Sequence, residues 1–508
     1  MKTPPRVILF QPKTGVLSEV KTRPSFPLSL LSAARNLEGD FQLVLVDQRL
    51  EADWSGRLAS ELRKGAVCVG ITSITGVQIK YALEASRLVK RQRPEIPVVW
   101  GGVHATLLPG ETLKEPSVDI VVRGEGEETF AGLVRSLLHK RSLEDVSGIS
   151  FRSDGNGSAI HNEPRPFVSL DSLPYVPYYV AKLDYLFMRK GRPSMYLETS
   201  RGCPLRCAFC YNSSVKNRTW RAMGPEAVIG SVEEILRAFP KVGHLSIVDD
   251  NFFVDLERVR KICALLLKNG SRLTYQVQGA SIQTLKRLSD EDLSLLKRSG
   301  CERVDMGVES GSAHILEEID KGISVQDVRE ANRRLMRMGI EPWFNFMSGF
   351  PMESEEDLKS TIRLMIDLER ENPKALLSPL YCYTPYPGNK LYERARQMGF
   401  EPPDSLEKWS EYGWDKARLP WISPRKARDL ESYYFLSIFV DRKVFEYASK
   451  WWVFLLAFLY RPLARLRFRR GLLGLMIEKH LYARLFEKDS IPLRRAHRGR
   501  SRARLSGR

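Results

Sequence analysis

The first 150 residues alternate short, uninterrupted apolar runs with amphipathic stretches. The runs RVILF, QLVLVD, AVCVGITS, PVVWGG and DIVVRGEG are rich in Val, Ile and Leu, and Gly, Asp or Ser follows or ends most of them. A continuous apolar run predicts a strand buried on both faces, and the stretches between the runs predict crossover helices. We therefore expect an α/β fold that begins with a parallel sheet over residues 1–150.

A second alternation begins near residue 191. Six strand-like runs, from SMYLETS to ALLSPLYCYTP, are separated by amphipathic helical stretches and predict a partial β/α barrel over residues 191–404. The intervening residues 151–190 are rich in Pro, Ser and Asp, which indicates a linker. The pattern breaks after residue 404, so residues 405–508 are expected to form a helical, basic C-terminal region.

Composition and charge fit this organisation. The chain has 508 residues, of which 43% are hydrophobic and 28% charged, enough for two to four globular domains. The net charge is +18, and residues 461–508 contribute most of it with 15 Lys and Arg against three acids. The N-terminus offers only a four-residue apolar run before polar and proline residues, so no secretory signal is expected and the protein is expected to be cytoplasmic.

The basic C-terminal region contains the apolar run WWVFLLAFLY, about half the length that a bilayer-spanning helix needs. With RPLARLRFRR after it, the run fits an interfacial helix in peripheral contact with the inner face of the cytoplasmic membrane. The alternative is a helical domain packed on the barrel, with an arginine-rich end. Nucleic acid is disfavoured, because phosphate binding explains the arginines but not two adjacent tryptophans.

One loop, RGCPLRCAFCYN, carries three of the seven cysteines. Cys203, Cys207 and Cys210 have the spacing C-x3-C-x2-C, and the other four cysteines are scattered singly along the chain. A cubane iron-sulfur cluster usually takes four thiolates, so three would leave one iron open to a small molecule. Gly202 and Pro204 indicate a turn rather than a buried core segment. The three thiols are therefore the predicted metal ligands.

This loop, with Phe209 just before the third thiol, resembles that of the radical S-adenosylmethionine (radical SAM) superfamily, and specifically its cobalamin-binding branch. The resemblance covers roughly residues 5 to 400. It implies an N-terminal Rossmann-like cobalamin domain and a partial (β/α)6 barrel. It also implies three cofactors: a [4Fe-4S] cluster, S-adenosylmethionine chelated to the open iron, and cobalamin.

The resemblance also implies contacts to S-adenosylmethionine at the ends of later barrel strands. Carboxylate and amide oxygens after the second strand suit the methionine ammonium, although a lone acid at a strand end also serves as a helix cap. The implied contacts are Asp249, Asp250 and Asn251 for the methionine amino group, Glu309 and Ser310 for the ribose, and Gly349 and Tyr381 along the nucleotide.

In the N-terminal half, ITSITG, WGGVHATLLPG and VRGEGEE resemble the cobalamin-binding domain. Small residues at strand ends let a corrin and its nucleotide tail approach backbone amides. His104 is expected to have a structural or tail-binding role rather than to bind cobalt. The implied cobalamin contacts are Ser73, Thr75, Gly101, Gly102, His104, Gly124 and Glu125.

The chain departs from one pattern of that domain. The methionine-synthase type uses D-x-H-x-x-G, whose histidine binds cobalt, whereas Asp47 is followed here by Gln48 and Arg49. A guanidinium stays protonated and has no lone pair to donate to a metal. We therefore expect a cobalamin whose lower face receives no histidine from this motif.

These observations favour an enzyme whose cofactors do most of the chemistry. The leading hypothesis is a cobalamin-dependent radical SAM enzyme that methylates or otherwise modifies an unactivated carbon of a small, lipid-like substrate. An external electron donor such as flavodoxin or ferredoxin would reduce it, and no catalytic side chain is predicted. The alternatives are an oxidative cyclase of the magnesium-protoporphyrin monomethyl ester type and a noncatalytic cobalamin carrier or sensor, which would leave the cysteine loop unexplained.

Overall fold

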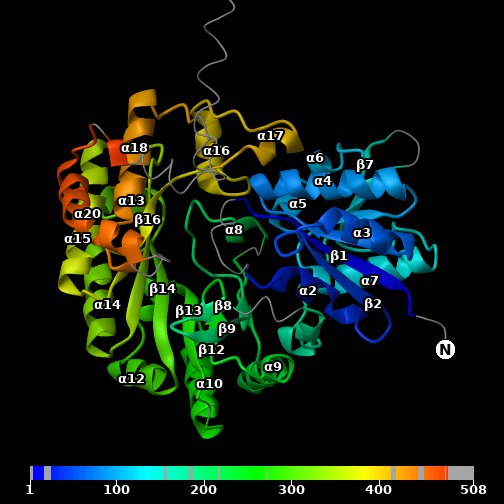
Figure 1. The fold of residues 1–508 in the computed structure, drawn as a ribbon, viewed down its shortest axis with the longest axis horizontal. Coiled ribbons are helices and arrows are strands. Elements are labelled where there is room, and N and C mark those ends of the chain that lie inside the picture. The colour runs from blue at the N-terminus through cyan, green and yellow to red at the C-terminus, as the bar shows by residue number, and fades with distance from the viewer. Residues whose placement is uncertain are drawn as a thin grey trace, which may run out of the picture.

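Two seven-stranded sheets organise the chain, one in each half, and they lie side by side (Figure 1). The structure is a computed structural model. It describes residues 4–15, 25–153, 157–181, 187–215, 218–270, 272–413, 419–443, 451–474 and 476–478.

The N-terminal sheet has the strand order β2-β1-β3-β4-β5-β6-β7, and its first five strands are parallel. Helices α2 and α7 contribute to the core on one face and helices α3 and α4 to the core on the other, as continuous apolar strands require. The predicted parallel sheet is confirmed. Its elements are β1 (Arg6–Gln11), α2 (Leu28–Ala34), β2 (Gln42–Asp47), α3 (Trp54–Arg63), β3 (Cys68–Thr72), α4 (Val77–Gln92), β4 (Val98–Gly101), α5 (Val103–Leu107), α6 (Pro109–Thr112), β5 (Ile120–Val122), α7 (Gly126–Leu138), β6 (Ile149–Arg152) and β7 (Ala159–His161).

This sheet continues into the segment predicted as a linker. Strand β6 pairs antiparallel with β5, and β7 pairs antiparallel with β6. The two strands are only four and three residues long, too short for their alternation to stand out from the surrounding polar residues. The crossing between the two halves therefore lies after His161.

The second sheet curls into a half barrel with the order β16-β15-β14-β13-β12-β9-β8. Six strands are parallel, and β8 adds an antiparallel hairpin at one edge. Strands β8 and β16 are not neighbours in this sheet, so the barrel is open, as predicted. Its strands are β8 (Phe187–Arg189), β9 (Arg192–Leu197), β12 (His244–Ile247), β13 (Thr274–Ser281), β14 (Cys301–Glu309), β15 (Glu341–Ser348) and β16 (Leu376–Cys382).

Helices cover the outside of this barrel (Figure 1). Three of them begin with a capping box, in which Ser289, Ser324 or Ser354 and an aspartate three residues later satisfy free backbone N–H groups. The helices are α9 (Pro225–Ala238), α10 (Leu256–Lys268), α11 (Ile282–Leu285), α12 (Asp290–Arg298), α13 (Ala313–Glu318), α14 (Val325–Arg337), α15 (Glu355–Glu371) and α16 (Lys390–Gln397).

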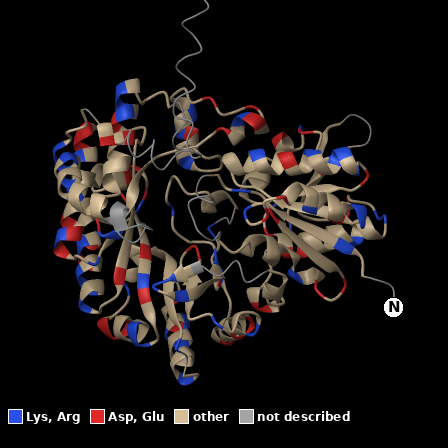
Figure 2. Cartoon of the chain, in the orientation of Figure 1, with Lys and Arg blue, Asp and Glu red and all other residues tan. Residues whose placement is uncertain are grey.

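The C-terminal region is helical over the residues described, and it contacts both halves. Helix α17 (Leu406–Ser410) adds Leu406 and Trp409 to the core beside α4, whereas α18 (Pro424–Ser437) and α20 (Trp451–Arg470) join the core of the barrel half. Figure 2 shows basic and acidic residues interspersed along the outer helices. No helix among the described residues is long and apolar enough to cross a membrane.

The segment from α18 onward protects the outer edge of β16. Asp441, which is 1% exposed, accepts a hydrogen bond from the Leu377 N–H at 2.5 Å, and the Ser437 hydroxyl accepts one from the Leu380 N–H at 2.9 Å. The buried ammonium of Lys443 donates to the Leu377 carbonyl. An edge strand with free N–H groups is open to pairing with other chains, and these contacts close that route.

We predict that Asp441→Ala lowers the free energy of unfolding by about 3 kcal/mol, because it removes a buried carboxylate that faces the Lys443 ammonium at 3.7 Å and accepts from the Leu377 N–H. Ser437→Ala, which removes one acceptor at the same edge, should cost only about 1 kcal/mol. The midpoints of thermal unfolding measure both effects. Equal midpoints for Asp441→Ala and the wild type would contradict this role for Asp441.

Candidate active site

The cysteine loop follows strand β9 at the carboxyl end of the barrel. The loop starts after β10 (Ser200–Arg201), which pairs antiparallel with β11 (Arg221–Ala222). This pairing holds the segment before the cysteines next to the segment after them. Gly202 has a φ of +83°, a conformation that favours glycine, and its N–H donates to Asp250 at 2.7 Å. The sharp turn brings the start of the cysteine loop against Asp250 and Asn251, which follow β12.

The three thiols of the loop lie close enough to influence one another electrostatically. All three are free and partly exposed, and the charges of Cys203 and Cys207 each raise the pKa of Cys210. Burial is the larger cause and raises the pKa of Cys210 to about 11. Burial also raises the pKa of Cys207, while the ammonium of Lys321 opposes it. Such thiols become good ligands only when a metal displaces their protons.

No three His, Cys, Asp or Glu side chains in the described part of the chain converge on one metal ion. A cubane does not require that, because each thiolate binds a different iron. Three free thiols at this spacing therefore fit a [4Fe-4S] cluster better than a single-ion site.

The acids after β12 differ in orientation. Asp249 is buried, and its carboxylate accepts three hydrogen bonds of 2.6 Å from the Thr199 N–H, the Thr199 hydroxyl and the Ser200 hydroxyl. Burial raises the pKa of Asp249 to about 6, although these bonds oppose the shift. Asp250 instead lines an open cavity. Asp249 thus fixes the strand that leads into the cysteine loop, while Asp250 is available to a ligand.

The residues after β14 form a buried ion pair. The Lys321 ammonium lies 2.7 Å from Glu309 Oε1 and 5.3 Å from the centre of the Phe209 ring. Glu309 has a φ of +71°, unusual for a residue with a side chain. The Ser310 hydroxyl is fully buried, lies 2.9 Å from the Thr361 hydroxyl and accepts from the Ser312 N–H. Lys321 thus links the end of β14 to the cysteine loop.

At the carboxyl ends of the last two barrel strands, the backbone after β15 lies very close to the last side chain of β16. A side chain at Gly349 would meet Cys382 Sγ at 2.9 Å, and Gly349 has a φ of +79°. Its N–H donates to Glu353 at 2.6 Å. Tyr381 is 38% exposed, and partial burial raises the pKa of its phenol. Neither Gly349 nor Tyr381 lines the cavity described next.

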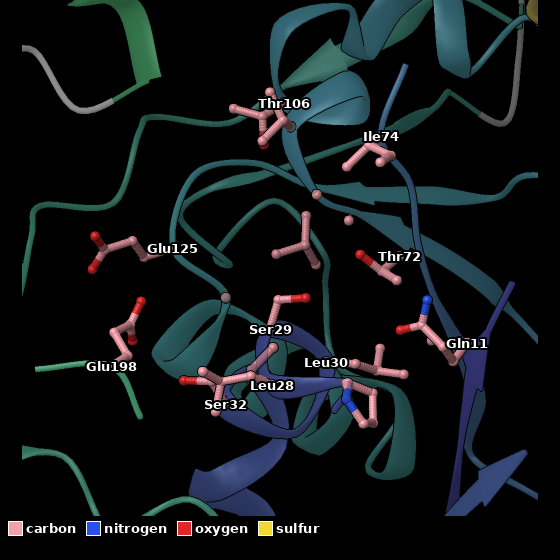
Figure 3. A pocket seen from close by; sticks show the side chains of 18 of the residues that line it. Gln11, Leu28, Ser29, Leu30, Ser32, Thr72, Ile74, Thr106, Glu125 and Glu198 are labelled. Atoms are coloured by element: carbon pink, nitrogen blue, oxygen red, sulfur yellow. The ribbon is translucent and has the colours of Figure 1, made fainter. Parts of the chain in front are cut away.

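A cavity of about 550 Å³ lies between the two halves. Loops after β3, β4 and β5 form one side of it, and Figure 3 shows Ser29 and Leu30 of α2 beside Thr72 at the end of β3, with Glu125 and Glu198 at one edge of the pocket. Barrel residues form the other side. Residues from the barrel half that line it are Tyr196, Glu198, Ser200, Arg201, Tyr211, Val215, Val248 and Asp250.

Four of the residues predicted to contact cobalamin line this cavity: Gly101, Gly102, Gly124 and Glu125. At Gly124 nothing lies within 4 Å of the position of a side chain, so the backbone there is open to a ligand. At Gly102 a side chain would meet a backbone oxygen at 2.4 Å, which makes glycine necessary at this approach of two loops.

The other three predicted cobalamin contacts do not line the cavity and instead bind to the loops that do. Ser73 supplies that backbone oxygen, and its hydroxyl donates to the Gly101 carbonyl at 3.1 Å. Thr75 lies 3.0 Å from Nδ1 of His104, which is fully buried and packs edge-on against Trp409. Burial lowers the pKa of His104 to about 4, so the ring stays neutral near pH 7. Its position accords with the expected structural role.

Arg49, which takes the motif position of the cobalt-binding histidine, lines the cavity. Its guanidinium forms a fork with Asp47, with Nη2 at 2.6 Å and Nε at 2.9 Å from the carboxylate oxygens. Both side chains are at most 3% exposed. The ion pair fixes the Arg49 guanidinium at the cavity, and this group cannot bind cobalt.

A buried ion-pair cluster joins the two halves beside the cavity. Arg201 Nη2 lies 2.5 Å from Glu127 and 2.7 Å from Glu198, and Nη1 lies 3.2 Å from Glu125. Burial alone would lower the pKa of Arg201, but the neighbouring carboxylates outweigh it and raise that pKa. Burial alone would raise the pKa of Glu127, but the Arg201 guanidinium outweighs it and the pKa falls to about 2. Ser32 on α2 also donates to Glu127. We call Arg201, Glu125, Glu127 and Glu198 the seam cluster.

Sequence reasoning missed several of these residues. Arg201 and Tyr211 flank the cysteines and could have been suspected from that position alone. Lys321 lies more than a hundred residues from the cysteines and carries no local signal. Its role emerges only from the strand order of the barrel.

Comparison with known families agrees with this architecture. The profile of the B12 binding domain matches residues 23–134, and that of the Radical SAM superfamily matches residues 197–365. The first range holds strands β2 to β5 of the N-terminal sheet, and the second holds strands β12 to β15 of the half barrel together with the cysteine loop.

Known proteins also match the chain over both domains. The uncharacterized methyltransferase PH0819 of Pyrococcus horikoshii is 29% identical over 78% of this chain and 84% of its own length. The anaerobic magnesium-protoporphyrin IX monomethyl ester cyclase of Rubrivivax gelatinosus is 27% identical over 64% of this chain, which spans only 58% of that cyclase. The solved structure of the cobalamin-dependent S-adenosylmethionine radical enzyme OxsB shares the fold, with a TM-score of 0.72 and 19% identity over 95% of this chain and 75% of OxsB.

The fold and the two domains define a radical SAM enzyme with an N-terminal cobalamin-binding domain. The chain belongs to the cobalamin-binding branch of the radical SAM superfamily, whose cofactors are a [4Fe-4S] cluster, S-adenosylmethionine and cobalamin.

We predict that Cys207→Ala abolishes formation of 5′-deoxyadenosine and leaves cobalamin binding largely intact, because the thiol and the cavity loops belong to different domains. After anaerobic reconstitution, chromatography of the reaction mixture measures 5′-deoxyadenosine, and the visible spectrum measures bound cobalamin. Loss of both in the variant would contradict this separation.

Proposed function

We propose that the protein is a cobalamin-dependent radical SAM methyltransferase that acts on an unactivated carbon of a small, lipid-like substrate. The observation that carries the proposal is the cavity between the two halves, because it is lined both by the glycine-rich loops of the N-terminal domain and by residues adjoining the cysteine loop. When bound, the cluster with S-adenosylmethionine supplies a 5′-deoxyadenosyl radical for hydrogen abstraction, and cobalamin supplies the methyl group.

Each side of the cavity has a distinct task in this proposal. Cys203, Cys207 and Cys210 hold three irons of the cluster, and the Asp250 carboxylate accepts hydrogen bonds from the methionine ammonium. Across the cavity, the backbone at Gly102 and Gly124 would lie against the corrin when cobalamin is bound. The predicted nucleotide contacts at Glu309, Ser310, Gly349 and Tyr381 stay predictions.

Arg49 takes the motif position of the histidine that binds cobalt in the methionine-synthase type of domain. Arg49, held by Asp47, faces this cavity and offers no lone pair. We propose that the cobalt receives no protein ligand from this motif. Tyr211 lines the same cavity directly after the last cysteine, where its ring would exclude water from the space between the cofactors.

Labelled S-adenosylmethionine tests methyl transfer. We expect that the reconstituted protein, given S-adenosylmethionine with a deuterated methyl group, hydroxocobalamin, a reductant and a lipid and pigment extract from cells lacking the protein, transfers the deuterated methyl group to one extract component. Mass spectrometry identifies the product, and Cys207→Ala is the control. A product that has lost hydrogen without gaining label would contradict methyl transfer and favour the cyclase alternative, which the similarity to the Rubrivivax enzyme supports.

We further propose that helix α20 contacts an anionic membrane surface. One side of α20 packs on the barrel through Ala464 and Phe468, and Arg461 and Arg465 pair with Glu369. The opposite side presents apolar side chains to solvent and ends in two exposed arginines, an arrangement typical of interfacial helices. The exposed apolar residues are Leu455, Leu456, Phe458, Leu459, Leu463 and Leu466.

Vesicle flotation tests this contact. The protein should float with vesicles that contain phosphatidylglycerol, and a Leu459→Ser and Leu463→Ser double variant should lose most of that binding, because both side chains are more than half exposed. The matched control replaces Leu138 and Leu267, which are also exposed, but on other helices, by serine. Equal flotation of the two double variants would contradict a membrane role for α20.

A further inference from the structure

Asn251 lies against the first cysteine of the loop rather than at the cavity. It follows β12, is fully buried, and its Nδ2 lies 3.5 Å from Cys203 Sγ. Its sequence position had suggested a contact with the methionine amino group. Because the side chain points at a thiol, a different role follows from its geometry.

Two further contacts hold Asn251 in place. The Thr284 hydroxyl on α11 lies 3.0 Å from Asn251 Oδ1, and the indole N–H of Trp220 donates to the Asn251 carbonyl at 3.0 Å. Thr284 is itself buried and also lies within hydrogen-bond distance of the Ser281 carbonyl. These partners come from three separate segments, so neither the backbone nor the side chain of Asn251 is free to swing away from Cys203.

The chemistry of a thiolate fixes which end of the amide faces it. If the amide were reversed, Oδ1 would face the sulfur, and a carbonyl dipole would oppose the negative charge of a metal-bound thiolate. With Nδ2 toward the sulfur, an N–H donates to that charge and Oδ1 accepts from Thr284. The amide therefore acts as a donor whenever Cys203 is a cluster ligand.

The other two cysteines receive their polar support differently. The backbone N–H of Asn212 lowers the pKa of Cys210 against the larger effect of burial, and the Lys321 ammonium does the same for Cys207. Of these three groups, only the Asn251 amide is both uncharged and part of a side chain. A substitution at Asn251 therefore removes this hydrogen-bond donor without changing the net charge or the backbone.

Hydrogen bonds to the sulfur ligands are one of the features that set the potential of an iron-sulfur cluster. One electron from an external donor reduces the cluster from the 2+ to the 1+ state, and no bond forms or breaks in that step. The added negative charge is partly carried by the thiolates, so a donor stabilises the reduced state more than the oxidised state.

We infer that Asn251 is a positioning residue that holds Cys203 and raises the reduction potential of the cluster by donating a hydrogen bond to its sulfur. The inference rests on the proposed binding of the cluster by the three cysteines. Thr284 acts through Asn251 by orienting the amide.

A redox titration of the anaerobically reconstituted full-length protein, followed by electron paramagnetic resonance (EPR), tests this role. Asn251→Leu, similar in volume but without a donor, should shift the midpoint potential to a more negative value than that of the wild type. Thr284→Val should give a smaller shift of the same sign. Asn332→Leu is the matched control, because Asn332 is equally buried in the same domain but pairs with α15 and Asn372.

Electron-nuclear double resonance on the reduced cluster gives a second readout. In deuterated buffer, the wild type should show an exchangeable-proton coupling that Asn251→Leu lacks and Asn332→Leu retains. If Asn251→Leu fails to assemble a cluster, the Thr284→Val potential decides the inference in its place.

The experiment distinguishes a wrong role for Asn251 from a wrong assignment of the cluster. Wild-type iron and sulfide contents with an unchanged potential and coupling in Asn251→Leu would overturn the role of Asn251 and leave the cluster assignment intact. A wild-type protein that assembles no cluster would overturn the assignment itself.

Discussion

The site depends on one buried interaction, the seam cluster that joins Arg201 to glutamates of both halves. Arg201 directly precedes the cysteine loop, and Glu125 and Glu127 lie at the start of α7, directly after the cavity loop that contains Gly124. Breaking a buried pair leaves an uncompensated charge and costs about 3 to 5 kcal/mol. The cysteine loop therefore cannot move away from the N-terminal domain without that cost, and the two cofactor sites keep a fixed separation.

This constraint explains why the polar groups around the cysteine loop divide into two kinds. Asp249, Asn251 and Lys321 are buried and hold the loop from within the barrel, whereas Asp250 and Tyr211 face the cavity. Support and ligand contact are thus separate tasks of neighbouring residues. A reaction shared by two cofactors requires such rigidity, because small misplacements of reacting groups are expensive.

The sequence predicted the large elements and the metal ligands, but not the direction of individual side chains. Five parallel strands and six barrel strands followed from long apolar runs, and the three cysteines followed from their spacing. Strands β6 and β7 were not predicted, because they are short and lie among polar residues. Asp249 and Asn251 could not be separated from Asp250 by pattern, since the turn after β12 decides which side chain faces inward. Glu127 pairs with a residue 74 positions away, a contact that no local signal indicates.

The most direct test of the account is the magnetic interaction between the reduced cluster and cob(II)alamin, measured by pulsed EPR on the wild type and on Glu127→Gln. The account predicts one narrow distance distribution for the wild type and a broader or longer one for the variant, because the variant weakens the seam cluster. Identical distributions in the two proteins, or no interaction in the wild type, would contradict the claim that the seam cluster fixes the two cofactors around one cavity.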